Sequence, residues 1–217
     1  MCDVPSSSFF PGIPKKDPIN SFYNEGIYVG YRYYETFNIP TSYEFGYGLS
    51  YTNFEYSNIQ LDTDTIGNIK VCVTLKNIGR KTGKEIVQLY ISAPTTEIDK
   101  PLYELKAFAK TTLLKPQESQ IVSFLLSAKD LASFQSGISS WVADKGEYIL
   151  SIGASVKDIR QKVSFHLPSS ILVEKVHDVL YPNFSIKDMN SASRKVLKEI
   201  PPKRPTKRIP HDFLWHW

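Results

Sequence analysis

The feature that most constrains the fold of this chain is an alternation of apolar and polar residues that recurs along its middle. In 69–76 every second residue is apolar, and related apolar runs lie at 121–126, 147–152 and 162–167. Successive side chains of a strand point to opposite faces of a sheet, so each run predicts a strand. Glycines and prolines separate the runs at short intervals, and helical periodicity is rare. The pattern predicts a mainly β chain of about seven strands, folded as an antiparallel β-sandwich rather than a parallel α/β sheet.

The two ends of the chain depart from this pattern. The first 20 residues contain four prolines, which prevent a regular helix or a central strand and predict an irregular N-terminal segment. Residues 128–134 are a short helical candidate, whereas 171–180 are compatible with a helix or a strand. Residues 191–217 are rich in proline and have a net charge of +5. Because the whole chain has a net charge of +4, residues 1–190 sum to −1. A basic, proline-rich end of this kind is typically a solvated tail.

A dense aromatic segment precedes the sandwich pattern. Of the 28 aromatic residues of the chain, 13 lie within 22–56, together with four of the 11 glycines. Nine of these aromatic residues and all four glycines belong to two phrases, NEGIYVGYRYYE at 24–35 and FGYGLSYTNFEYS at 45–57. Neither helical nor strand periodicity accounts for their spacing. Such a density of large rings predicts a surface that packs against a partner.

Three further phrases follow these two: LKNIGRKTGKEIVQLYISAP at 75–94, KPLYELKAFAKTTLLKPQES at 100–119 and DKGEYILSIGAS at 144–155. Together, and in this order, the five phrases resemble the C-terminal part of family 3 glycoside hydrolases, the family of β-glucosidases and β-xylosidases. The resemblance covers residues 3–167. It implies that 3–44 correspond to the end of the family's α/β sandwich domain, and that a fibronectin type III-like domain, an immunoglobulin-like β-sandwich, follows.

We therefore predict three parts of the chain. Residues 1–50 are a remnant of the α/β sandwich domain with its linker, 51–168 are the fibronectin type III-like domain, and 169–217 are a basic C-terminal extension. The resemblance implies that the parent enzyme hydrolyses terminal β-D-glucosyl residues by double displacement, without a metal or another cofactor. It also implies two partners, the catalytic barrel and the α/β sandwich domain on the same or a separate chain, and a β-glucoside or oligosaccharide as ligand.

The chain itself carries no predicted catalytic residue. Retaining glycoside hydrolysis requires two carboxyl groups ~5–5.5 Å apart, one as nucleophile and the other as acid/base. In the family these are an aspartate of the barrel and, usually, a glutamate early in the second domain, and neither motif occurs among the 217 residues. An α/β barrel alone typically takes about 250 residues. We therefore predict an accessory or structural role and no turnover by this chain alone, with Glu25, Glu35 and Glu44 as the acids to test if turnover is seen.

Five side chains in and beside the aromatic run are the candidate site residues: Glu25, Tyr28, Tyr31, Arg32 and Tyr34. We predict that they make inter-domain contacts, because an arginine fork between tyrosines suits the fixing of one domain on another. Arg32 would pair with Glu25 or with a group of another domain. Contact between these side chains and a sugar is the alternative interpretation.

Cysteine and histidine content indicates no other kind of site. Cys2 and Cys72 lie 70 positions apart and predict no disulfide framework, and no histidine spacing fits a metal site. We predict no nucleic-acid partner and no membrane association, because excess basic charge is confined to the tail and no long apolar run occurs. The sequence assigns no compartment, although a true start at Met1 would imply an intracellular protein.

A second functional class fits the same pattern. A stand-alone β-sandwich that binds carbohydrate or protein would use an exposed aromatic belt as its binding surface. A truncated product without a function of its own is a third interpretation. Co-purification with a separately encoded catalytic half would favour the accessory role over both.

Overall fold

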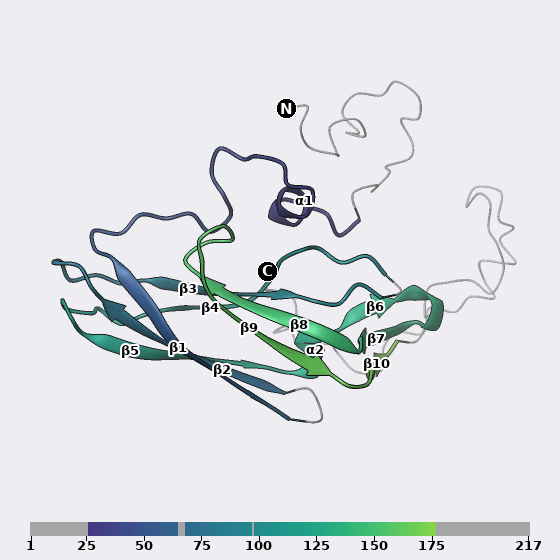
Figure 1. The fold of residues 1–217 in the computed structure, drawn as a ribbon. Coiled ribbons are helices and arrows are strands. Elements are labelled where there is room, and N and C mark those ends of the chain that lie inside the picture. The colour runs from purple at the N-terminus through teal and green to yellow at the C-terminus, as the bar shows by residue number, and fades with distance from the viewer. Residues whose placement is uncertain (1–25, 65–67, 97, 177–217) are drawn as a thin grey trace, which may run out of the picture.

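The computed structural model describes residues 26–64, 68–96 and 98–176 (Figure 1). Its helices are α1 (Tyr31–Thr36), α2 (Ala128–Leu131) and the short 3-10 helix η2 (Ser136–Ile138). Its strands are β1 (Phe54–Thr63), β2 (Ile69–Asn77), β3 (Ile86–Ser92), β4 (Glu104–Lys110), β5 (Ser119–Leu126), β6 (Ser133–Gln135), β7 (Ser140–Ala143), β8 (Gly146–Gly153), β9 (Ile159–Leu167) and β10 (Ile171–Lys175).

The strands form two facing sheets and a smaller sheet at one end (Figure 1). The first sheet has the order β1-β2-β5, and the second has the order β4-β3-β8-β9. The small sheet has the order β10-β7-β6. Each pairing between these strands is antiparallel. Two antiparallel sheets packed face to face make a β-sandwich, which confirms the predicted fold class.

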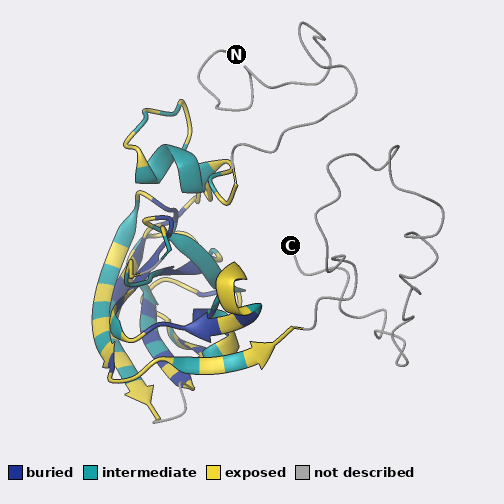
Figure 2. Ribbon diagram, turned by 90° about the vertical axis from the view of Figure 1, so that its right-hand side faces the viewer, coloured by how far each residue is buried: buried dark blue, intermediate teal, exposed yellow. Residues whose placement is uncertain are grey.

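The core lies between the two larger sheets, and strand alternation supplies its side chains. In β2, Ile69, Val71, Val73 and Leu75 are buried, while the residues between them are exposed or half-buried. The same alternation is visible as coloured bands along the strands in Figure 2. Burying one side chain of this size contributes roughly 1.5–3 kcal/mol to folding. The predicted period of two is thus the arrangement that builds the core.

Both faces of β3 are buried from Val87 to Ile91. Val87, Leu89 and Ile91 belong to the core between the sheets. Gln88 and Tyr90 point to the outer face and are buried as well. Because the outer face of a two-layer sandwich is normally open to water, a further segment must cover β3 on that side.

The first strand begins within the second aromatic phrase. β1 starts at Phe54, and Tyr51, three positions before it, is 95% exposed. The chain before β1 is held by the loop after β2, where Asn77 Oδ1 accepts a hydrogen bond from Thr52 Oγ1 at 2.7 Å. Asn77 is fully buried and also donates from Nδ2 to two backbone carbonyls at 2.8 and 2.9 Å. These bonds fix the entry to the sandwich before strand pairing starts.

The two segments with the weakest pattern adopt short elements. Within 128–134 the helix covers only Ala128–Leu131, and Asp130 closes its first turn by accepting bonds from the N–H and hydroxyl of Ser127 at 2.7 and 2.8 Å. Of 171–180, the first five residues form β10, which pairs with β7. No helix in the described part of the chain has the length and apolarity needed to span a membrane.

Candidate functional site

Residues 26–50, which we call the N-terminal arm, lie over the outer face of the β4-β3-β8-β9 sheet (Figure 1). Gln88 of β3 anchors the end of the arm, because its Nε2 donates to the carbonyl of Gly46 at 3.2 Å and to that of Ala154 at 2.5 Å. A Cβ at position 46 would come within 2.2 Å of Gln88 Oε1, and Gly46 has a φ of 81°. Both facts require glycine at this bend, where the chain passes from the arm to the sandwich.

Tyr31 is the aromatic contact between α1 and the sheet. Its ring stacks on Phe45 with the ring centroids 4.4 Å apart, and it lies edge-to-face with Tyr90 of β3 at 6.2 Å. Its hydroxyl accepts a hydrogen bond from the N–H of Leu105 at 2.9 Å. Burial, with smaller effects of Tyr31 and Glu35, raises the pKa of Tyr90 above its ordinary range. Tyr31 therefore accounts for much of the cover that β3 requires on its outer face.

Helix α1 depends on the sandwich for its stability. It has six residues, and isolated helices shorter than about 12–15 residues are marginal in water. Besides Tyr31, its last residue Thr36 contacts the chain that leads into β4, because Thr36 Oγ1 accepts a bond from the N–H of Leu102 at 2.9 Å. Asn38, just beyond the helix, takes a φ of 52°, a conformation that ends helices.

Arg32 pairs with Glu104 of β4. Its Nη2 lies 2.9 Å from Glu104 Oε1, and the two side chains are 30% and 31% exposed. Lys106 Nζ lies 2.9 Å from the other carboxylate oxygen of Glu104. Glu25, the other candidate partner of Arg32, lies outside the described residues. Sequence reasoning missed Glu104, which is 72 positions from Arg32 and carries no motif of its own.

Tyr28 and Tyr34 contact other aromatic residues of the arm. The ring of Tyr28 lies edge-to-face with Phe37 at 5.3 Å between centroids, and Tyr34 does so with Tyr33 at 5.6 Å. Tyr33 also lies 5.0 Å from Phe37, so these rings form one cluster. Desolvation, with a smaller contribution from the charge of Asp99, raises the pKa of Tyr28. The cluster belongs to the arm itself rather than to the core of the sandwich.

The two described carboxylates of the arm are bound to the chain between β8 and β9. Glu35 Oε1 lies 3.6 Å from Lys157 Nζ, and its side chain is only 12% exposed. Glu44 Oε1 accepts a hydrogen bond from the Ser155 hydroxyl at 3.0 Å. Both contacts tie the arm to the sandwich, so these two acids have a structural role.

The arm carries large exposed apolar side chains, and no residue of the arm is buried. In Figure 2 the arm is intermediate or exposed throughout, whereas the strands beneath it have buried bands. The exposed arm residues are Ile27, Val29, Phe37, Tyr43, Phe45, Tyr47 and Leu49. Tyr51, just after the arm, and Phe108 on the outer face of β4 are 95% and 71% exposed. So many exposed large apolar side chains on one short segment indicate an interaction surface.

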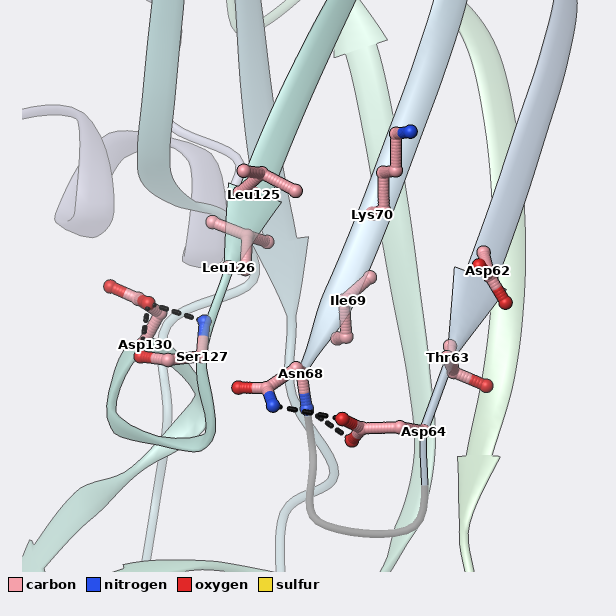
Figure 3. Close-up of a pocket in the computed structure, with 10 residues that line it drawn as sticks. All are labelled: Asp62, Thr63, Asp64, Asn68, Ile69, Lys70, Leu125, Leu126, Ser127 and Asp130. Carbon is pink, nitrogen blue, oxygen red and sulfur yellow. Dashed lines mark hydrogen bonds between the residues drawn. The ribbon is translucent and has the colours of Figure 1, made fainter.

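A separate hollow lies between the end of the β1-β2 hairpin and the start of α2 (Figure 3). Its carboxylates serve local contacts: Asp64 accepts two bonds from Asn68, at 2.7 and 2.8 Å, and Asp130 caps α2 through Ser127. Among the described residues, no group of three or more potential metal ligands is close enough to hold an ion. The hollow therefore does not suggest a catalytic or metal centre.

The family comparison agrees with this architecture. Residues 85–156 match the fibronectin type III-like domain. The chain is 39% identical over 205 residues to thermostable β-glucosidase B of Acetivibrio thermocellus, a match that covers 90% of this chain and 26% of that protein. It is 41% identical over 184 residues to β-glucosidase A of Butyrivibrio fibrisolvens, covering 74% and 22%. This chain corresponds to the C-terminal part of a family 3 glycoside hydrolase.

Solved structures of the family have the same fold. β-Glucosidase 3B from Thermotoga neapolitana, in complex with α-D-glucose, superposes with a TM-score of 0.73 at 48% sequence identity, covering 79% of this chain and 24% of that one. The GH3 β-glucosidase of Bifidobacterium adolescentis gives a TM-score of 0.71 at 27% identity, covering 81% and 26%. The chain thus spans about a quarter of the length of these relatives, and the family resemblance predicted from the five phrases is confirmed.

Proposed function

We propose that this chain is the accessory part of a β-glucosidase-like enzyme that hydrolyses terminal β-D-glucosyl residues, and that it docks onto the catalytic domains without catalysing hydrolysis itself. The observation that carries the proposal is the combination of fastening and exposure in the arm. The arm is fastened to the sandwich through Tyr31, Arg32 and Gly46, and it also exposes large apolar side chains. An arm with this arrangement joins the sandwich to a further body.

The absence of turnover follows from the chemistry of retaining hydrolysis. A nucleophile and an acid/base are both needed to form and to break the glycosyl intermediate. Glu35 and Glu44 are engaged by Lys157 and Ser155. Because of these contacts, neither acid is a free carboxyl group that could flank a bound sugar.

The proposed partners are the catalytic barrel and the α/β sandwich domain of the parent enzyme, on the same or a separate chain. The exposed arm side chains are mainly aromatic, a residue type enriched at the centre of protein interfaces. Relatives four times as long as the matched region supply the room for both domains. Tyr28, Tyr31, Arg32 and Tyr34 then act in positioning the arm, and Glu25, which precedes it, belongs to the same proposed junction.

Hydrolysis of an aryl β-glucoside by the purified 217-residue chain tests the catalytic half of the proposal. β-Glucosidase 3B from Thermotoga neapolitana serves as the positive control. We expect no turnover from the folded chain. Turnover that persists after repurification would overturn this half, and Glu35→Gln and Glu44→Gln variants would then locate the acids.

Co-purification tests the docking half. The chain is co-expressed with the part of the Thermotoga neapolitana enzyme that precedes the region matched here. We expect a stable complex that Leu49→Ser and Tyr43→Ser weaken by roughly tenfold or more, about 1.4 kcal/mol of binding free energy. Leu125→Ser is the matched control, because Leu125 is 77% exposed but lies on β5, in the sheet that the arm does not cover. Equal weakening by the control variant, or no complex with the unsubstituted chain, would contradict docking through the arm.

A further inference from the structure

A small groove lies between the start of the arm and the β10-β7-β6 sheet. Its volume is about 260 Å³, somewhat below the ~300–1,000 Å³ that is usual for sites that bind drug-sized ligands. It is lined by Ile27 and Arg32 of the arm, by Glu104 of β4, and by Phe134 and Trp141 of the small sheet. A groove of this size has room for a small ring rather than for a long chain.

One wall of the groove is aromatic. Phe134 on β6 and Trp141 on β7 are cross-strand partners, with ring centroids 5.6 Å apart and ring planes inclined by 58°. They are 42% and 40% exposed, so their rings are open to a ligand. The face of an aromatic ring is electron-rich and attracts the slightly positive C–H groups of an apolar face laid against it.

Arg32 and Glu104 add to the lining planar groups that donate and accept hydrogen bonds. The guanidinium of Arg32 has five N–H donors, and the contact with Glu104 Oε1 uses the nitrogen Nη2. Glu104 accepts from Arg32 and Lys106, and a carboxylate has about four lone-pair positions in total. Because both side chains are about 30% exposed, unused donors and acceptors remain within reach of a ligand in the groove.

The charge of the lining is balanced. Arg32 and Lys100 are opposed by Asp99 and Glu104. The balance holds when the charges behind the lining are counted: Asp144 pairs with Lys100, at 2.6 Å between Oδ2 and Nζ, and Lys106 pairs with Glu104 at 2.9 Å. Balanced charge favours a neutral ligand over an anion or a cation, since an ion would meet one like charge for each opposite one.

We propose that this groove is a non-catalytic binding site for one neutral pyranose ring. A pyranose has an apolar C–H face, which suits the rings of Phe134 and Trp141, and a rim of hydroxyls, which suits Arg32 and Glu104. The preference for a glucosyl ring rests on the proposed function, whereas the match to a ring-shaped neutral polyol does not. Binding by the isolated chain is measured without the catalytic domains, so its failure and the failure of docking or of the proposed β-glucosidase role are separate outcomes.

The test is a titration of the 217-residue chain with D-glucose and with cellobiose, followed by the indole N–H signals in ¹H–¹⁵N spectra. The chain has three tryptophans, and the spectrum of Trp141→Leu identifies the signal of Trp141. We expect a saturable shift of that signal, with a dissociation constant on the order of 1–10 mM for a ligand of this size. D-Mannitol, an open-chain polyol, is the ligand control and should leave the signal unchanged at the same concentrations.

Variants separate ring contact from fold effects. Trp141→Leu and Phe134→Leu keep an apolar side chain on the small sheet but remove a ring. We expect each to weaken sugar binding by roughly threefold to tenfold. Because Trp141→Leu removes the indole signal, sugar binding to that variant is followed through the backbone signals of β7. Phe108→Leu is the matched control, since it removes an exposed ring that does not line the groove. The proposal is overturned by no shift with either sugar, by an equal shift with mannitol, or by unchanged binding in both groove variants.

Discussion

The arm and the sandwich use the same kinds of residues in opposite ways. Tyr90 and Tyr148 of the sandwich are fully buried, and Tyr148 donates its hydroxyl proton to the carbonyl of Asp144 at 2.7 Å. In the arm no residue is buried, and Tyr43 is 73% exposed. These large rings of the sandwich are therefore buried within the chain, whereas several of those of the arm are exposed. A segment with a buried core and a segment without one can thus follow each other directly in one sequence.

The polar contacts show the same difference. The sandwich contains a buried ion pair, Lys100 with Asp144, whose side chains are 4% and 6% exposed. The pair between the arm and the sandwich, Arg32 with Glu104, is about 30% exposed on both sides. Removing one partner of a buried pair leaves an uncompensated charge away from water, and removing one partner of an exposed pair does not. The two pairs therefore predict effects of very different size.

The largest expected effect is that of Lys100→Met. It leaves the Asp144 carboxylate buried with the amide of Gln135, at 3.0 Å, as its remaining side-chain donor. We expect the free energy of unfolding in urea to fall by roughly 3–5 kcal/mol. Lys129→Met is the matched control, because Lys129 Nζ lies 3.9 Å from a carboxylate of Glu174 in a pair about 60% exposed, and it should cost about 1 kcal/mol or less. A loss as small as that of the control would mean that water reaches Asp144.

A smaller effect is expected from substitutions that loosen the arm. Tyr31→Phe removes the acceptor of the Leu105 N–H, and Arg32→Ala removes the pair with Glu104. Each should lower the free energy of global unfolding by about 1 kcal/mol or less, because the core does not depend on these contacts. Cleavage within 26–50 by a protease at low concentration should accelerate before any change in the sandwich.

Two outcomes for Tyr31→Phe and Arg32→Ala would contradict the division into a stable sandwich and a fastened arm. One is that protease cleavage accelerates equally in the arm and in the sandwich. The other is a fall in the urea midpoint as large as that of Lys100→Met. Tyr33→Phe serves as the control, since the ring of Tyr33 lies among other arm residues and its ring contacts with Tyr34 and Phe37 survive loss of the hydroxyl.

The sandwich was largely predictable from sequence because its signals are local. Alternation in 69–76 fixes which residues of β2 face the core, and the same period of two recurs in the buried residues of β5. The family resemblance was equally accessible, because it rests on contiguous phrases. Segments with a weak pattern were less predictable. Helix α2 is shorter than the 128–134 candidate, and β10 depends on pairing with β7.

The contacts of the arm were not predictable, since each joins residues far apart in the chain. Arg32 meets Glu104 across 72 positions, and Gln88 meets Gly46 across 42. No periodicity selects such partners, because the distance in sequence is set by the intervening loops rather than by the contact. The role of Tyr28 and Tyr34 in inter-domain or sugar contact stays a prediction, and so does the division of the chain into 1–50, 51–168 and 169–217.

The smallest expected effect concerns the hollow where the end of the arm meets the sandwich, which is lined by Gly46, Glu85 and Arg160. Burial raises the pKa of the Glu85 carboxyl, and the N–H of Ile86 and the charge of Arg160 oppose that shift without cancelling it. Between its ordinary pKa and the raised one, the folded chain binds more protons at Glu85 than the unfolded chain does. Stability from this group is therefore present at low pH and is lost as the pH rises through that interval.

Glu85→Gln removes this loss while keeping an oxygen that can accept the Ile86 N–H, which Glu85 Oε1 binds at 2.9 Å. We expect the urea midpoint of the variant to exceed that of the unsubstituted chain more at about pH 7 than at about pH 4. Glu55→Gln on β1 provides the correction for removing one exposed negative charge. A difference of the opposite sign would mean that Arg160 stabilises the Glu85 carboxylate more than burial destabilises it. The charge of Glu85 would then stabilise the junction between arm and sandwich instead of destabilising it.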